Sequence, residues 1–297
     1  MPMNLRALAS LFIGALAIAM SGILFRFTDV SPIASGFWRV ALAVPIFGVW
    51  MIVDTARVAD HGNEILRSWW REPGILWCGV FFAGDLIFWH YALAHNSVAV
   101  ATLESNMTPL LVVAAMWMFY GQRPTAAFLA AIAISVAGLL AITSPKLVQH
   151  SGELRGDVYG LITAVFYAGY LFTVARVRSR FRTSQVMFAT TLVAALVLLP
   201  LSLLGTFLPT STQGWVAVVA LALVAQCLGQ GLIAYALAHL PTAFGSVGLY
   251  VQPVAAALYA WVLLGEKLSA VQLAGAALVL LGIALARRAS SQSTERR

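Results

Sequence analysis

The pentapeptide YALAH occurs twice in the chain, at residues 91–95 and again 144 positions later at residues 235–239. At this offset, 14 of the 58 residues from 85 to 142 are identical to their counterparts from 229 to 286. The identities include scarce residue types: Pro109 with Pro253, Trp117 with Trp261, Gly121 with Gly265, and Gly138 with Gly282. The chain is therefore duplicated. The repeated unit is too long for a solenoid or a propeller, whose repeats span about 20 to 50 residues.

The composition places both copies in a membrane. Hydrophobic residues make up 61% of the chain and charged residues 10%, with a mean hydropathy of +0.88, whereas about 25% of residues are charged in a soluble globular protein. A helix needs roughly 20 apolar residues to cross a bilayer, and only helices or closed barrels satisfy their backbone there. Apolar runs without strand alternation lie at 7–27, 33–53, 73–94, 97–119, 125–143, 156–177, 184–207, 214–237, 242–263 and 269–287. The sequence predicts an all-α integral membrane protein with ten transmembrane helices.

Some of these runs have alternative interpretations. The first follows Arg6 and resembles the apolar part of a secretory signal, but nine further spans favour a permanent anchor. The junctions near 95–97 and 238–242 are short enough for a kinked continuous helix; because two full spans placed end to end exceed a bilayer, we expect tight hairpins. Cys78 and Cys227 fall inside apolar runs, which favours buried thiols over a disulfide or a metal site.

The basic residues predict the orientation. Thirteen of the 18 Lys and Arg residues fall on one side of a ten-helix arrangement and four on the other, with Arg39 inside a span. Lys and Arg are enriched on the cytoplasmic side, so both termini are predicted to be cytoplasmic, in a bacterial-type inner membrane. The sequence pI of about 9.8 is then a consequence of topology and not a sign of nucleic-acid binding.

The odd number of helices in each copy has a consequence for their arrangement. With five helices per copy, the second copy enters the membrane from the side opposite to the first. Inverted repeats are typical of secondary transporters, because two interconvertible halves open one central site to either face in turn. A membrane scaffold or an intramembrane enzyme could also be duplicated, but neither gains from inversion. We predict a first repeat at 1–143, an external linker at 144–155, a second repeat at 156–287 and a cytoplasmic polar tail at 288–297.

The second copy resembles the closing segment of the EamA family in the drug/metabolite transporter superfamily. The similarity lies in the helix-central Pro253, the Gly-Glu pair before the last helix and the glycine within that helix, and the first copy repeats the pattern with Gln122 in place of the usual Glu. Near the start, Pro32 and Arg39 match the family's early Pro and second-helix Arg. The resemblance implies ten helices around a central cavity and export of amino acids, other metabolites or drugs.

The two paired prolines indicate where the site lies. A proline within a helix frees the carbonyl four residues earlier, here those of Ser105 for Pro109 and Leu249 for Pro253. Interrupted helices in corresponding positions of two halves indicate a transporter's binding site. We predict that both prolines act as hinges; the alternative is a packing kink without a role in binding.

Charged side chains inside the apolar runs narrow the prediction. Asp85 lies at the centre of its span, where a charge costs about 2.5 to 3.5 kcal/mol, on one stripe with Trp77, Phe81 and Trp89. Glu104 and Arg39 both lie about 10 Å below the outer surface by helix rise, so they could pair with each other. Asp85 and its stripe are expected to face the cavity, although such a stripe can also serve packing or lipid contact.

Further side chains complete the predicted site. Aromatic and neutral polar groups suit a small-molecule pocket, and His90 could carry protons. The predicted substrate-binding residues are Asp85, Trp89, His90, Glu104, Asn106, Tyr167, Tyr170, Gln226, Gln230, Tyr250 and Gln252. His95 and His239 are instead expected to cap hairpin ends.

The sequence also predicts absences and a function. No spacing indicates a metal site, a nucleotide-binding loop or a catalytic triad, so we expect no cofactor, no ATP-driven step and no enzyme activity. The prediction is a secondary exporter of small metabolites, with amino acids of apolar or aromatic character favoured. A multidrug or other metabolite exporter, a scaffold and a hydrolase using Asp85 and Glu104 stay open, as do proton coupling, direction of flux and oligomeric state.

The predicted topology can be tested with reporter fusions. A reporter enzyme that is active only in the cytoplasm, fused after residue 297, should be active, because the basic residues keep this end inside. A second fusion within the turn that follows Ala94 should be inactive. External activity at residue 297 would overturn the predicted orientation.

Overall fold

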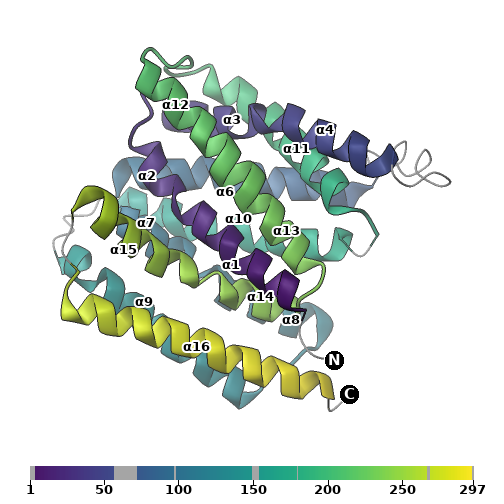
Figure 1. The fold of residues 1–297 in the computed structure, drawn as a ribbon, viewed down its shortest axis with the longest axis vertical. Helices are drawn as coiled ribbons and strands as arrows, with labels where there is room; N and C mark the ends of the chain where they lie inside the picture. Colours follow the sequence, from purple (N-terminus) through teal and green to yellow (C-terminus); the bar gives the residue numbers. More distant parts are fainter. Residues whose placement is uncertain are drawn as a thin grey trace.

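The computed structural model describes residues 4–56, 72–96, 98–148, 154–178, 180–265 and 268–295. These residues form helices joined by turns, with no strand among them (Figure 1). In chain order the helices are α1 (Leu5–Ala19), α2 (Ser21–Phe25), α3 (Pro32–Ala41), α4 (Ala43–Ala56), α6 (Pro73–His95), α7 (Val98–Ser105), α8 (Thr108–Tyr120), α9 (Ala126–Val148), α10 (Leu154–Val177), α11 (Thr183–Ser202), α12 (Thr212–Ala220), the π-helix η2 (Leu221–Gln230), α13 (Gly231–Leu237), α14 (Thr242–Gly248), α15 (Val251–Leu264) and α16 (Ala270–Glu295).

Within the described ranges, nine helical segments are long and apolar enough to cross a membrane. They are Leu5–Phe25, Pro32–Ala56, Pro73–His95, Ala126–Ser144, Leu154–Val177, Thr183–Ser202, Thr212–Leu237, Thr242–Leu263 and Ala270–Ser290. The prediction of an all-α multi-pass membrane protein is confirmed. The predicted span 97–119 forms the two short helices α7 and α8 and is not among the nine, so the number ten stays a prediction.

Local sequence signals set several helix ends. The Asn4 side chain accepts hydrogen bonds from the first turn of α1, and Ser31 does the same for α3 just before Pro32, since such side chains satisfy the free N–H groups of a first turn. At the other end, Gly121 and Gly265 follow α8 and α15 with φ of +63° and +68°. Glycine tolerates this left-handed conformation without strain, and these two glycines are counterparts in the repeat.

The two copies of YALAH end their helices in the same way. Nδ1 of His95 lies 2.9 Å from the carbonyl oxygen of Tyr91, and Nδ1 of His239 lies 2.9 Å from that of Tyr235. Both imidazole rings are exposed, and each contacts a carbonyl in the last turn of a helix: His95 is the last residue of α6, and His239 lies two residues after the end of α13. That these histidines cap hairpin ends stays a prediction.

Helices α9 and α16 lie next to each other (Figure 1), and they approach each other closely at glycines. A Cβ atom at Gly138 would lie 2.5 Å from the carbonyl oxygen of Gly275, and one at Gly282 would lie 2.7 Å from that of Ala131. Ala131 and Gly275 are counterparts at the 144-residue offset, as are Gly138 and Gly282. The contact of Gly138 with Gly275 is therefore repeated by the contact of Gly282 with Ala131, with the two copies exchanged. Residue numbers rise along α9 as they fall along α16, so the two helices run antiparallel.

The remaining helices also pack in pairs that join one copy of the repeat to the other. Helix α6 packs against α10, while α1 packs against the π-helix and α13, and α3 packs against α11. Gly14 and Gly229 allow the backbones of α1 and the π-helix to approach closely. A Cβ atom at Gly14 would lie 2.8 Å from the Gly229 carbonyl oxygen. Small residues at such crossings are how membrane helices gain packing contact.

The α9–α16 crossing should be sensitive to a single methyl group. Gly138→Ala should lower the free energy of unfolding by about 1 to 3 kcal/mol, because the added Cβ overlaps backbone that cannot rotate away. The matched control is Gly231→Ala, where the nearest atom to a Cβ is 3.7 Å away and the helix gains propensity. Thermal melting in detergent should show a loss for Gly138→Ala and none for the control; equal melting temperatures would contradict the close crossing.

Asp29 generates a prediction about acid stability. It lies between α2 and α3, outside the apolar spans, and its Oδ2 accepts hydrogen bonds from Thr210 and Ser211 before α12. Hydrogen bonding from Ser211, aided by Thr210, lowers the pKa of Asp29 to about 2. Since the pKa in the unfolded chain is higher, about 3.9, the carboxylate stabilises the fold above that pH, and this contribution is lost as the pH falls toward 2.

Melting temperatures measured from pH 6 to pH 2 should therefore separate the wild type from Asp29→Asn. The difference between the two proteins should be constant above pH about 4 and shrink below it. Parallel curves down to pH 2 would show that Asp29 does not contribute in this way.

Candidate functional site

A small cavity lies inside the bundle where α1, α2, α3, α6, α7, α10, α15 and the π-helix meet. We refer to it as the central cavity. Its free volume is about 50 Å³, enough for a few water molecules and too small for an amino acid. It is lined by Ile18, Ala19, Ser21, Gly22, Arg39, Asp85, Trp89, Thr102, Ser105, Thr163, Tyr167, Gln230, Gln252 and Ala256.

Five of the eleven predicted substrate-binding residues line this cavity: Asp85, Trp89, Tyr167, Gln230 and Gln252. They come from four elements that are distant in the sequence, with the first two on α6 and one each on α10, the π-helix and α15. The structure thus brings both copies of the repeat to a single cavity.

Two opposite charges line the central cavity. Arg39 is 2% exposed and Asp85 is 8% exposed, and the two interact electrostatically. Arg39 Nε donates a hydrogen bond to Gln226 Oε1 at 3.3 Å. Charges inside a membrane protein are costly unless they are paired or face a polar cavity. A ligand with both a cationic and an anionic group would complement this pair.

Three neutral polar atoms on the cavity wall lack hydrogen-bond partners among the described residues: Tyr167 Oη, Gln230 Oε1 and Gln252 Nε2. The Tyr167 hydroxyl lies close to both amides without reaching hydrogen-bond geometry. A buried polar atom without a partner costs about 1 to 3 kcal/mol, and native proteins contain few of them. A bound polar ligand or water would satisfy all three.

The other predicted substrate-binding residues lie outside the cavity lining. His90 is buried against Gly36 and Phe25, with Nδ1 2.7 Å from the Leu86 carbonyl oxygen. Glu104 is half-buried against Gly160 and lies 3.4 Å from Asn96 Nδ2. Gly156 in turn lies against the Asn96 side chain, so Gly156 and Gly160 both make packing contacts between α10 and the α6–α7 region.

The remaining four occupy the layer behind the cavity or the helix breaks. Asn106 Nδ2 donates to the Thr102 carbonyl at 2.6 Å, and Tyr170 stacks on Tyr167 with its hydroxyl toward Met187. Gln226 is fully buried beside Arg39. Tyr250 is fully buried, and its hydroxyl has no partner within the described part of the chain. A role in binding for these residues stays a prediction.

Two expectations about contacts are corrected. The suggested Arg39–Glu104 pair is not formed, because Arg39 bonds Gln226 and Glu104 bonds Asn96. The aromatic stripe also does not face the cavity as a unit, since Trp77 is 55% exposed while Asp85 and Trp89 line the cavity. Successive i, i+4 residues advance around a helix by about 40°, so the stripe turns from the outer surface into the interior.

Several lining residues escaped the sequence analysis. Arg39 was noted as an intramembrane charge but not placed in the site. The hydroxyl groups of Ser21, Thr102, Ser105 and Thr163 were missed, because small hydroxyl residues are common in membrane helices and carry little signal on their own.

Both predicted hinge prolines follow helix interruptions. The segment from Val98 to Tyr120 breaks between α7 and α8, just before Pro109, and the counterpart breaks between α14 and α15, just before Pro253. In the first break the Thr108 hydroxyl donates to the freed Ser105 carbonyl at 2.6 Å and lies 3.2 Å from the Ala164 carbonyl oxygen. The interruptions are present; their movement stays a prediction.

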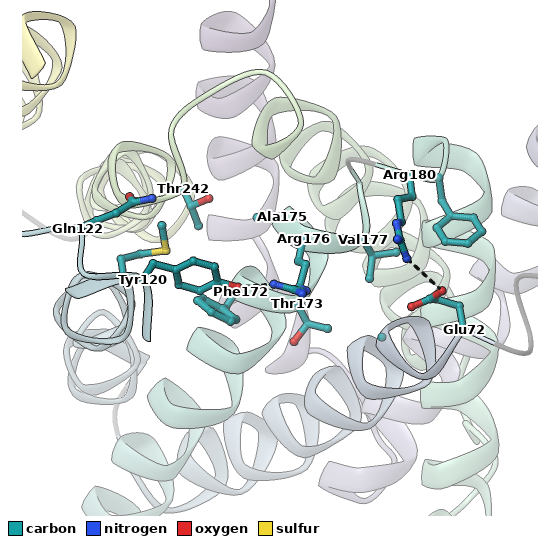
Figure 2. A pocket seen from close by; sticks show the side chains of 13 residues that line it. Glu72, Tyr120, Gln122, Phe172, Thr173, Ala175, Arg176, Val177, Arg180 and Thr242 are labelled. Atoms are coloured by element: carbon teal, nitrogen blue, oxygen red, sulfur yellow. Dashed lines mark hydrogen bonds and ion pairs between the residues drawn. The ribbon is translucent and has the colours of Figure 1, made fainter. Parts of the chain in front are cut away.

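A larger cavity opens at the end of the bundle where α8 and α10 terminate (Figure 2). We refer to it as the vestibule; its volume is about 450 Å³. Figure 2 shows Arg176 near Tyr120, to whose hydroxyl it donates at 2.7 Å, and Arg180 facing Glu72 at 3.8 Å. These residues fall on the side predicted to be cytoplasmic. Such a volume is typical of a small-molecule pocket.

Metal ligation has no counterpart in the part of the chain that the structure describes, where no group of three His, Cys, Asp or Glu side chains converges. Cys78 and Cys227 are both free thiols. The chemistry of the central cavity is therefore that of charged and neutral hydrogen-bonding groups.

Residues 5–144 and 154–288 each match the model of the EamA-like transporter family. The chain belongs to this family. The two matches meet near the connection between α9 and α10, so this EamA-like transporter contains the family unit twice. The family and its relatives are transporters rather than enzymes.

Named relatives are similar over most of this EamA-like transporter. The pseudopaline exporter CntI of Pseudomonas aeruginosa is 30% identical over 216 residues, which cover 72% of this chain and 75% of that protein. A probable terminal-alkyne amino-acid exporter of Streptantibioticus cattleyicolor is 27% identical over 221 residues, 73% of each chain. A solved crystal structure shares the fold, with a TM-score of 0.78 at 21% identity over 97% of this chain and 99% of that one.

Proposed function

We propose that this protein is a secondary transporter that exports amino acids with apolar or aromatic side chains across the inner membrane by alternating access. The observation that carries the proposal is the central cavity, in which Arg39 and Asp85 lie beside Trp89 and Tyr167. An amino acid is a zwitterion whose carboxylate matches a guanidinium and whose ammonium matches a carboxylate. The two aromatic side chains offer apolar surface to its side chain.

The names of the relatives support export of this class. One relative is named an exporter of pseudopaline and another a probable exporter of a terminal-alkyne amino acid. The excess of Lys and Arg on the side of the vestibule supports its cytoplasmic placement, which is the side from which an exporter takes its substrate.

Inverted repeats are supported by the α9–α16 crossing. The approach of Gly138 to Gly275 is repeated by the approach of Gly282 to Ala131 with the two copies exchanged, which is the pattern of a self-complementary interface around a two-fold axis. An axis perpendicular to these helices lies in the membrane plane and relates the two halves that we place at 1–143 and 156–287. Such halves exchange conformations to open one site on either side.

The two cavities support alternating access. The central cavity holds about 50 Å³ and the vestibule about 450 Å³, so the larger space in this conformation lies at one end of the bundle and the space beside the binding residues takes only a few water molecules. We infer that an amino acid enters from the vestibule when α8 and α14 move at the interruptions before Pro109 and Pro253. Closure behind the substrate then precedes opening to the outside.

Glu104 is proposed to handle protons and not to hold the substrate. Asn96 Nδ2 lies 3.4 Å from Glu104 Oε2 and 3.0 Å from Asp157 Oδ1, so one amide joins two carboxyl groups. Like charges held this close favour sharing of a proton. We place this group at the external end of α6, α7 and α10, where it could exchange protons with the outside.

Transport should depend on both intramembrane carboxyl groups. In liposomes loaded with labelled amino acids, Asp85→Asn should lower the transport rate about tenfold or more, because a charge-assisted hydrogen bond contributes about 1.5 to 3 kcal/mol. Glu104→Gln should remove the pH dependence of transport while leaving the melting temperature near that of the wild type. Asp54→Asn is the matched control, since this carboxyl lies near the end of α4, pairs with Arg182 and is outside the lining of both cavities.

Two results would contradict this assignment. Wild-type transport rates in both variants from pH 5 to pH 8, or failure of both to fold, would make these carboxyl groups structural. Transport of hydrophobic drugs without transport of any amino acid would replace the proposed substrate class with the multidrug alternative.

A further inference from the structure

Three buried side chains form a hydrogen-bonded chain that ends at the central cavity. Arg39 Nε donates to Gln226 Oε1 at 3.3 Å, and Gln226 Nε2 donates to Thr191 Oγ1 at 3.2 Å. Arg39 is 2% exposed, and the other two side chains are fully buried. The members come from α3, the π-helix and α11, and of the three only Arg39 lines the cavity.

Arg39 and Thr191 together hold the Gln226 amide: Arg39 selects which end faces it, and Thr191 bonds the other end. A glutamine amide has an accepting oxygen and a donating nitrogen, whereas a guanidinium only donates. Gln226 must therefore present its oxygen to Arg39, and its nitrogen then donates to the Thr191 hydroxyl, which keeps the amide in place. Rotation of the amide by half a turn would place an NH₂ group against an N–H group and leave two buried donors without acceptors, which is costly in a protein interior.

The π-helix provides the position from which Gln226 acts. Residues 221–230 are wound as a π-helix between α12 and α13, an uncommon winding that is frequent at functional sites. The counterpart segment of the first copy lies in α6, which is α-helical throughout. This local difference between the copies coincides with the two glutamines, Gln226 and Gln230, that approach the cavity.

We propose that Gln226 and Thr191 are positioning residues that orient Arg39 to bind the carboxylate of the transported molecule. Because Arg39 Nε donates to Gln226, the terminal nitrogens of the guanidinium can bind the ligand. A carboxylate accepts two parallel hydrogen bonds from a guanidinium. The inference rests on the proposed amino-acid transport and adds a requirement: the substrate must carry a free carboxylate. An ammonium group alone, facing Asp85, does not suffice for full affinity.

The test compares two ligands that differ only at the carboxyl group. Equilibrium binding of labelled L-phenylalanine and L-phenylalaninamide is measured on purified protein in lipid nanodiscs. The wild type should bind phenylalanine at least tenfold more tightly, since a hydrogen-bonded charge pair is lost with the amide. Thr191→Val should remove most of this difference by weakening phenylalanine binding alone, and Thr191→Ser, which keeps the hydroxyl, should restore it.

Thr190→Val is the matched control. Thr190 is the preceding residue of α11 and is also fully buried, but its hydroxyl lies near Cys78 and makes no hydrogen bond of standard geometry in the described part of the chain. This variant should keep the ligand preference of the wild type. A general packing effect would lower the affinity for both ligands equally in the Thr191→Val and Thr190→Val variants.

Three outcomes overturn the inference: equal binding of both ligands by the wild type, binding of neither, or an equal loss for both ligands in Thr191→Val. Failure of the proposed function gives a different result, in which the wild type prefers phenylalanine and Thr191 controls that preference, yet no transport of phenylalanine occurs in liposomes.

Discussion

The fold depends on one constraint: a backbone polar group inside a bilayer must find its partner within the protein. The described helices satisfy this constraint with their internal hydrogen bonds. At the helix break before Pro109, which lies beside the central cavity, a side chain supplies the missing partner. Where Pro109 frees the Ser105 carbonyl, the Thr108 hydroxyl takes up that acceptor. Ser105 and Thr102, at the end of the interrupted helix, both line the cavity. An interruption that would be costly against lipid is thus tolerated where polar groups gather.

The buried polar side chains near the central cavity fall into two groups. One group is internally satisfied, as in the chain from Arg39 through Gln226 to Thr191. The other group keeps hydrogen-bonding capacity on the cavity wall, where Gln230 Oε1 and Gln252 Nε2 have no hydrogen-bond partner among the described residues. In the proposed function the first group orients a charge and the second offers contacts to a ligand, so the two tasks would fall to different residues.

The repeat and the membrane class could be predicted because both follow from periodic or compositional patterns. Positions around a helix were harder to predict. His90 lies five residues after Asp85, a rotation of about 140° from the cavity face, and it packs against Phe25. Tyr170 lies three residues after Tyr167 and is turned into the core beside Phe82. Which face looks inward depends on contacts with α3 and α11, and these contacts cannot be inferred from α6 and α10 alone.

The duplicated frame is nearly symmetric, but the residues that carry charge are not. The counterpart of Asp85 is Gly229, which lets α1 approach the π-helix closely. The counterpart of Thr108 is Gln252, so a hydroxyl that satisfies the backbone in one copy is replaced by an amide that faces the cavity in the other. In the proposed alternating access, matching packing in the two copies would allow two conformations of similar energy. Unmatched polar residues would then give the proposed zwitterionic substrate one preferred orientation, because its two ends would meet different groups.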